Sequence, residues 1–197
     1  WEEKTVFANF AVGFSREKNR VSSFDLSFQS SCKFAELDLY QASQELAEKV
    51  INSLGAESIN SFQGSVILSP YSVLSLLAAP ISFAVNAESV VNGISPWKDQ
   101  IGKNVSGHGL SIIDDAHLYG GVGSRSFDRE GISPEKVEII RDGVLKSFLH
   151  NSYTAAKVGT KSTGHASGGA RNQPSISASN FIIKPGEKVA LVGPTGA

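Results

Sequence analysis

Residues 136–149 read KVEIIRDGVLKSFL, and this stretch decides the fold of the C-terminal half of the chain. Lys136 to Ile140 and Val144 to Leu149 are apolar runs on either side of Arg141-Asp142-Gly143. Asp-Gly between two such runs is typical of a β-hairpin, because both turn residues tolerate the positive φ that a two-residue turn requires. The stretch therefore predicts antiparallel β-structure here.

Further elements are predicted on both sides of this hairpin. Leu110 to Ile113 is a strand closed by Asp114-Asp115, and Gly64 to Leu68 is a short buried strand. The stretch from Gly159 to Ser179 is rich in Gly, Ser and Thr, which indicates a loop or an irregular sheet edge.

A helix is predicted directly after the strand Gly64 to Leu68. Ser69-Pro70 provides an N-cap and a first-turn proline, so the helix begins there. The apolar run Val73 to Val85 continues it as a buried helix, which Pro80 should kink or divide. The run falls short of the roughly 20 residues that cross a bilayer, so no membrane segment is predicted.

The N-terminal part of the chain predicts a hairpin followed by a helix. Thr5 to Phe14 and Val21 to Phe28 both alternate in polarity, with the polar residues Ser15 to Asn19 as the turn. Asp38 to Leu54 repeats its apolar residues at steps of three and four, with Asp38 as N-cap and Gly55 as the left-handed C-terminal residue. The fold class predicted for the whole chain is α+β.

Composition excludes several classes of protein. The 197 residues carry a net charge of −1, which gives no bulk attraction to nucleic acid or anionic membranes. A single cysteine, Cys32, excludes an internal disulfide and a Cys-only zinc site, and no local motif marks it as a nucleophile. The acidic N-terminus is no signal peptide, so we expect a cytoplasmic protein.

The histidines do not have the spacing of a zinc hydrolase. Such a site requires two His on one helical face, usually four residues apart, with a Glu nearby. No pair of histidines in the chain has that spacing, so surface or hydrogen-bonded histidines are expected. The four are His108, His117, His150 and His165.

The stretch Phe127-Asp128-Arg129-Glu130-Gly131 gathers two carboxylates and a guanidinium within three residues. On an extended segment Asp128 and Glu130 would point to the same side. Paired carboxylates can carry out acid–base chemistry or bind a cation. The alternative is a structural cluster that holds a turn.

The C-terminus resembles the strand and first part of the phosphate-binding loop of ABC-type ATPases, from Lys184 to Gly193-Pro-Thr-Gly-Ala197. That loop requires a further Gly-Lys-Ser/Thr, because its lysine meets the phosphates and its hydroxyl meets magnesium. The chain does not contain these residues, so nucleotide binding is not predicted.

Several segments in order resemble the TldD/PmbA family, once described as modulators of DNA gyrase. The resemblance is most specific at Phe127–Gly131 and at the hairpin Asp142–Leu149. Weaker matches in the same order are Val66–Pro70, Asn86–Ser89, Ile112–Asp115, Asn151–Ala155, Ser162–Gly164 and Ile183–Gly186. The family's proteins are longer than this chain, and the chain has no Met. We therefore expect residues 1–58 to end an N-terminal domain and residues 64–197 to form an incomplete, β-rich C-terminal domain with packed helices.

The resemblance implies a peptidase system of two kinds of subunit. TldD-type members are zinc metallopeptidases with a His-Glu-x-x-x-His helix and a later cysteine ligand, whereas the PmbA (TldE) partners lack that motif. Here the helix after Ser69-Pro70 contains neither His nor Glu, and Cys32 lies upstream of it. The chain therefore resembles the PmbA members, and we predict no catalytic residue, metal or cofactor of its own.

The leading hypothesis is a non-catalytic subunit that binds an unfolded peptide beside a TldD-like zinc peptidase or within a homodimer. Substrate-binding residues are predicted to be Asp128, Arg129, Glu130, Thr163 and Gly164. The second hypothesis is a metallopeptidase of the same family acting alone. The third is a gyrase- or nucleic-acid-associated module, against which the net charge and the absence of a basic, aromatic stripe count.

Overall fold

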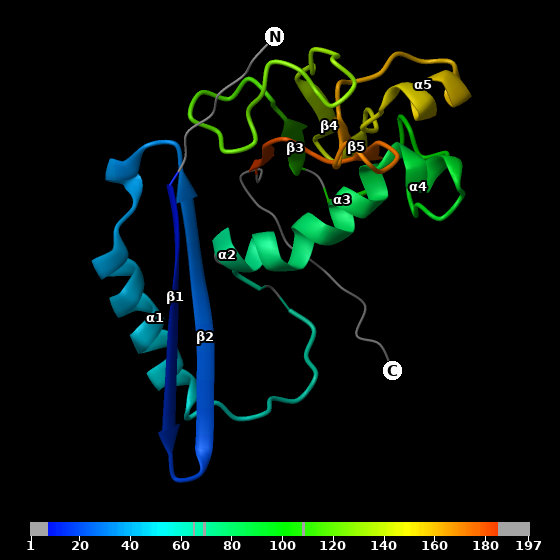
Figure 1. Ribbon diagram of the computed structural model, residues 1–197. Coiled ribbons are helices and arrows are strands. Elements are labelled where there is room, and N and C mark those ends of the chain that lie inside the picture. The colour runs from blue at the N-terminus through cyan, green and yellow to red at the C-terminus, as the bar shows by residue number, and fades with distance from the viewer. Residues whose placement is uncertain (1–7, 65, 69, 108, 185–197) are drawn as a thin grey trace. The chain divides into compact units, whose positions relative to one another are not determined.

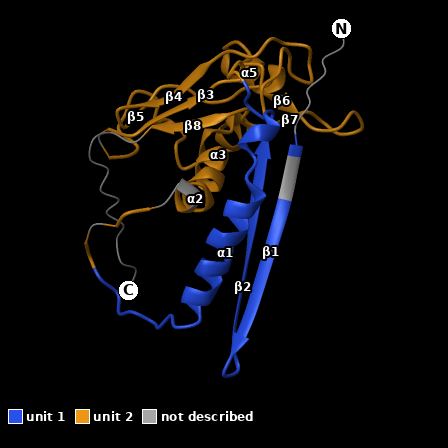
Figure 2. Cartoon of the chain, turned by 90° about the vertical axis from the view of Figure 1, so that its left-hand side faces the viewer, with its two compact units in different colours: residues 1–62, 120–122 blue, residues 63–119, 123–197 orange. Residues whose placement is uncertain are grey.

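The computed structural model describes residues 8–64, 66–68, 70–107 and 109–184 (Figure 1). The chain divides into two compact units, coloured separately in Figure 2. Unit 1 comprises residues 1–62 and 120–122, and unit 2 comprises residues 63–119 and 123–197. Both helices and antiparallel sheets are present, which confirms the predicted α+β class.

Unit 1 begins with the predicted hairpin, formed by β1 (Ala8–Lys18) and β2 (Val21–Ser31). The strands pair antiparallel from Ala8↔Ser31 to Lys18↔Val21. The predicted turn at Ser15 to Asn19 is wrong, because β1 continues to Lys18. The turn consists of Asn19 and Arg20, at φ 52° and 66°. A two-residue turn with both residues left-handed matches the twist of the strands.

The helix of unit 1 follows the prediction closely at its start. After η1 (Phe34–Glu36), α1 (Leu39–Ser53) begins where Asp38 accepts a hydrogen bond from the Gln41 N–H at 2.9 Å. Ala42, Leu46 and Val50 are its buried stripe. Gly55 is not left-handed as predicted. The N–H groups of Leu54 and Gly55 instead bond back to the carbonyls of Ile51 and Asn52, which tightens the last turn.

The hairpin turns its more polar β2 face toward α1. Asp25 forms an ion pair with Lys49, and Ser23 is hydrogen-bonded to Ser53, both from α1. Phe24 and Phe28 have the opposite parity and are 63% and 67% exposed. An alternating strand usually buries its apolar face, so unit 1 leaves open the face that the pattern would place in a core.

Unit 2 is built on a four-stranded sheet in the order β5-β4-β3-β8, with all pairs antiparallel. Its strands are β3 (Ser111–Asp114), β4 (Val137–Arg141), β5 (Val144–Leu145) and β8 (Phe181–Lys184). Asp142 and Gly143 join β4 to β5 at φ 47° and 83°, which confirms the predicted hairpin, although its second strand ends at Leu145 and not at Leu149.

One helical path runs through α2 (Pro70–Val73), the π-helical η2 (Leu74–Ala78) and α3 (Ala79–Val85) (Figure 1). The π turn ends at Ala78, two residues before Pro80, whose missing N–H cannot bond back into the helix. Only the end of this path is buried as predicted: Ile81 and Val85 join the core, whereas Leu74 is 55% exposed. Next comes α4 (Ala87–Val91).

The core of unit 2 lies between α3, α4 and the sheet. It combines Val85 and Ala87 with sheet residues such as Ile112, Ile139 and Leu145, all fully buried. The remaining elements are α5 (Ser152–Val158) and a small ladder of β6 (Ala166–Ser167) and β7 (Ser175–Ile176). The stretch 159–179, predicted as a loop or an irregular sheet edge, thus contains two short strands.

The strand predicted at Gly64 to Leu68 is not formed by the described residues 64 and 66–68. Ile67 is 99% exposed. Backbone groups of an extended segment need a neighbouring strand, and the described chain places none beside this one. Ser69 and the tail from residue 185 to Ala197 lie outside the described residues, as does His108.

Candidate functional site

Asp128 is the centre of a tight turn in unit 2. Its side chain is 3% exposed, and its carboxylate accepts three backbone hydrogen bonds. Oδ1 accepts from the N–H groups of Glu130 (2.8 Å) and Ile132 (3.0 Å), and Oδ2 accepts from Ala166 N–H (2.9 Å). Carboxylates that accept several backbone donors fix a loop firmly. Asp128 therefore joins its turn to β6.

Glu130 and Arg129 leave this turn in different directions. Glu130 Oε2 accepts from Ser152 N–H (2.8 Å) and Ser152 Oγ–H (2.6 Å) at the start of α5. Arg129 Nη2 donates to the Asn172 carbonyl at 2.5 Å, and its Nη1 is buried without an acceptor among the described residues. The segment is a turn and not extended, so Asp128 and Glu130 do not share one side, and the contacts of Asp128 are those of the alternative, a cluster that holds a turn.

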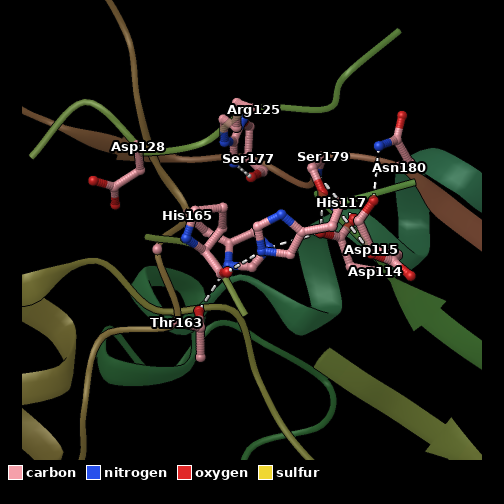
Figure 3. A network of polar contacts seen from close by, with 12 residues as sticks. Asp114, Asp115, His117, Arg125, Asp128, Thr163, His165, Ser177, Ser179 and Asn180 are labelled. Atoms are coloured by element: carbon pink, nitrogen blue, oxygen red, sulfur yellow. Dashed lines mark hydrogen bonds and ion pairs between the residues drawn. The ribbon is translucent and has the colours of Figure 1, made fainter. Parts of the chain in front are cut away.

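A chain of buried polar groups runs beside this turn (Figure 3). His165 is fully buried, with Nε2 2.7 Å from Asp114 Oδ2 and Nδ1 2.8 Å from Thr163 Oγ1. Thr163 Oγ1 also accepts from the His150 N–H at 2.8 Å. Every member has a partner, as buried polar groups require. The described histidines are hydrogen-bonded, as expected.

Thr163 and Gly164 connect this network of polar groups to a neighbouring loop. Gly164 has a φ of +73°, and a Cβ on it would come within 2.3 Å of Pro134 Cα. The Glu135 N–H donates to the Thr163 carbonyl at 3.1 Å. Two backbones thus approach closely here, which only glycine permits. The turn of Asp128 and the segment of Gly164 lie side by side, because the Ala166 N–H, two residues after Gly164, donates to Asp128 Oδ2.

His150 is a buried member of the same network, joined to it by the bond from its N–H to Thr163 Oγ1. Its Nδ1 is 3.2 Å from Thr154 Oγ1, and the side chain is 7% exposed. Burial, and then the neighbouring His165, lower the pKa of His150 below its ordinary value. The neutral imidazole is therefore favoured in the folded chain.

The end of β3 provides residues that the sequence analysis did not select. Asp114 is fully buried and also accepts from Ser179 N–H (2.9 Å). Asp115 pairs with Lys136 at 2.9 Å, and that hydrogen-bonded cation holds the pKa of Asp115 below its usual range. Asn180 Nδ2 donates to the Asp115 carbonyl at 2.8 Å. The signal for this cluster was the Asp-Asp pair directly after an apolar strand.

Cys32 lies in unit 1, apart from these polar groups in sequence. Its side chain is half-buried, and Sγ lies 3.9 Å from the Gly121 carbonyl. A thiol at that distance makes only a weak contact, in agreement with an incidental thiol.

Unit 2 has relatives among known proteins. A family model described as the PmbA/TldA metallopeptidase C-terminal domain matches residues 61–191. The chain belongs to the PmbA/TldD family, as the motifs in its sequence indicated.

Individual relatives agree with this assignment. The protein "Metalloprotease PmbA" of Escherichia coli O157:H7 is 32% identical over 124 residues, 63% of this chain and 27% of that protein. A metalloprotease of Methanocaldococcus jannaschii is 32% identical over 143 residues, 73% of this chain and 32% of that protein. A solved Thermotoga maritima structure, titled as a modulator of a DNA gyrase, has a TM-score of 0.75 and 28% identity.

The chain spans only part of each relative. The structural match with the Thermotoga maritima protein includes 92% of this chain but only 40% of that chain. Among the described residues no helix has both the length and the apolar character that a membrane crossing needs. No group of three or more His, Cys, Asp or Glu side chains in the described part is arranged to hold a metal ion.

A metallopeptidase requires a metal ion, and the helical path Pro70–Val85 corresponds to the helix that holds zinc in the TldD-type pattern. Its residues are apolar side chains, serines, prolines and one tyrosine. None of these is a usual zinc ligand, which would be His, Cys, Asp or Glu. The residues of this helix therefore do not fit a zinc ion.

Proposed function

We propose that the chain is part of a PmbA-like (TldE-like) subunit that binds an extended peptide and leaves hydrolysis to a TldD-like zinc peptidase. Family membership supports the peptidase context. The composition of the helix Pro70–Val85 supports a non-catalytic role, because it offers no zinc ligand. In this proposal the protein is cytoplasmic and pairs with a TldD-like subunit or with a second copy.

The open edge of β8 is the observation that carries the peptide-binding proposal. The sheet order ends at β8, and no described strand pairs with its other edge. The opposite edge strand, β5, is instead bonded to Gly102 and Lys103 through the Leu145 carbonyl and N–H. Extended peptides are commonly held by adding a strand to such an edge.

The ladder indicates which β8 groups face that edge. Asp115 N–H donates to the Asn180 carbonyl, one step before the pair Asp114↔Phe181. Hydrogen-bonded and non-bonded pairs alternate along an antiparallel ladder. Ile182 therefore bonds to β3, while Phe181 and Ile183 direct their N–H and C=O groups to the open side.

The five residues predicted from the sequence have two different roles in this proposal. Arg129, whose side chain is only half-buried, is the member that contacts the peptide. Asp128, Glu130, Thr163 and Gly164 hold the turn and the neighbouring loop that line the peptide site. Each of these four residues has at least one polar atom hydrogen-bonded within unit 2, which suits residues that shape a binding surface.

The experiment removes the edge donor and keeps the fold. Ile183→Pro deletes the outward N–H, and Ile183→Ala is its control because it loses the side chain but retains the N–H. Binding of a fluorescein-labelled, C-terminally amidated peptide of Thr, Val and Ser is followed by anisotropy. We expect binding to the proline variant to weaken roughly fivefold or more relative to the alanine variant. Equal binding by two folded variants would contradict the use of this edge.

The relatives' names favour one other candidate, a metallopeptidase that acts alone. Metal analysis and peptide hydrolysis by the purified protein without a partner distinguish the two. Stoichiometric zinc together with hydrolysis would replace the subunit proposal. Hydrolysis only after a TldD-like protein is added supports it.

A further inference from the structure

Unit 1 contains a hollow of about 400 Å³ at the end of its hairpin. The hairpin contributes Arg16, Lys18, Asn19 and Val21, and the last turn of α1 contributes Ile51 and Leu54. The hollow therefore has two cations beside three apolar side chains, all within one compact unit.

The register explains why the hollow exists. Arg16↔Ser23 and Lys18↔Val21 have the same parity as Phe14↔Asp25, so all three pairs face α1. The helix covers this face up to Ser53, which bonds to Ser23. The last pair, Lys18↔Val21, lies beyond the helix end, which leaves Val21 51% and Ile51 43% exposed.

The last carbonyls of α1 do not need Arg16 or Lys18 as hydrogen-bond donors. Cations near a helix C-terminus often bond its last carbonyls. Here the carbonyls of Ile51, Asn52 and Ser53 already accept from the N–H groups of residues 54–56. No ion pair joins Arg16 or Lys18 to another described residue. Their donors are available to a ligand.

We propose that this hollow binds the C-terminal carboxylate of a peptide whose last side chain is apolar. The guanidinium of Arg16 suits a carboxylate because its N–H groups match both oxygens, and Lys18 adds a point charge. Val21, Ile51 and Leu54 take the terminal side chain. The inference rests on the proposed function in that the ligand is a peptide, and it adds a preference for free C-termini.

The test compares acid and amide forms of one probe. Fluorescein-labelled Gly-Ser-Ala-Leu with a free carboxylate and the same peptide as its amide are titrated into the protein and followed by anisotropy. The acid should bind about tenfold or more tightly than the amide, as expected for charge-assisted hydrogen bonds to a carboxylate. Equal binding of acid and amide overturns the proposal.

Variants assign the preference to the hollow. Arg16→Gln with Lys18→Gln should abolish the difference between acid and amide. Lys161→Gln with Arg171→Gln removes the same charge from exposed positions of unit 2 and should preserve the difference. A preference that survives the first pair, or is lost equally in the second, contradicts the site.

Two further arms separate this proposal from others. Decanoate carries a carboxylate on an apolar chain, so saturable binding of decanoate that Arg16→Gln with Lys18→Gln abolishes, without binding of the peptide acid, would assign the hollow to fatty acids and overturn a peptide site. The amidated peptide used for β8 reports the proposed function independently, because it responds to Ile183→Pro and has no free carboxylate. Loss of one signal with retention of the other shows which proposal has failed.

Discussion

Asp128 illustrates how one buried side chain organises a loop. Its two oxygens accept from three backbone N–H groups, one of them from β6. Asp128→Asn places an amide NH₂ against at least one of these donors. We expect the free energy of unfolding to fall by about 1–3 kcal/mol, the cost of buried donors without an acceptor. Urea denaturation followed by circular dichroism measures it.

Glu130→Gln is the matched control for this substitution. Glu130 uses a single oxygen, Oε2, toward Ser152, and a glutamine oxygen can replace it. The expected loss is below about 1 kcal/mol. If Asp128→Asn were as mild as Glu130→Gln, the carboxylate of Asp128 would not be holding the turn.

His150 predicts a dependence of stability on pH. Burial and His165 lower its folded pKa below 6.5, the ordinary value that applies to the unfolded chain. As pH falls through 6.5, His150 becomes protonated in the unfolded chain but stays neutral in the folded chain. Stability is therefore complete above the unfolded pKa and is lost below it, by at most about 1.4 kcal/mol per pH unit.

The comparison of wild type with His150→Asn isolates this contribution. An asparagine amide can take the place of Nδ1 beside Thr154 Oγ1 but does not titrate. Urea midpoints between pH 7.5 and 5.5 should fall more steeply for the wild type. Parallel curves would show that another group causes the dependence.

At the scale of elements, the close approach of the loop at Gly164 to the loop at Pro134 predicts a steric effect that can be separated from backbone strain. Gly164 and Gly131 have nearly the same φ, +73° and +78°. A Cβ at Gly164 would come within 2.3 Å of Pro134 Cα, whereas Gly131 has nothing within 4 Å. Gly131→Ala should cost about 1 kcal/mol for the left-handed backbone alone.

Gly164→Ala should cost clearly more, by about 1–3 kcal/mol beyond the control, because the Pro134 backbone must also move. Thermal unfolding of both variants under the same conditions measures the difference. Equal melting temperatures would mean that the two loops separate at little cost.

Local signals predicted individual elements well where the chemistry is contained in the element. The Asp142-Gly143 turn and the Asp38 N-cap were both predictable because each depends on a few adjacent residues. The strand Gly64 to Leu68 was not, because a strand forms only beside a partner. The open apolar face at Phe24 and Phe28 also depends on which side α1 packs.

The candidate site was less accessible to sequence reasoning than the fold. The sequence analysis selected Asp128, Arg129, Glu130, Thr163 and Gly164 as site residues. It did not select Asp114 or His165. Asp114 and His165 are 51 positions apart, and no local pattern indicates that they meet. Only the antiparallel sheet and the return of the chain through β6 bring these segments together.

At the scale of the whole molecule, the division into two units predicts where a protease cuts first. Residues 56–64 and 66–68 have no helix or strand, and Ile59 and Ile67 are 78% and 99% exposed. Proteases cleave exposed segments that can enter their active sites without unfolding a domain. We therefore expect thermolysin, which prefers apolar residues after the cut bond, to cleave here.

Limited digestion followed by intact-mass measurement tests this expectation. The first products should be two fragments that divide between residues 55 and 68, and the larger one should retain the secondary structure of unit 2. The buried β4 residues Ile139 and Ile140 provide the internal control, since they are fully buried and should be cut only after global unfolding. Early cleavage within β3 or β4, with residues 56–68 intact, would show that the segment between the units is protected and that unit 2 is the less stable of the two.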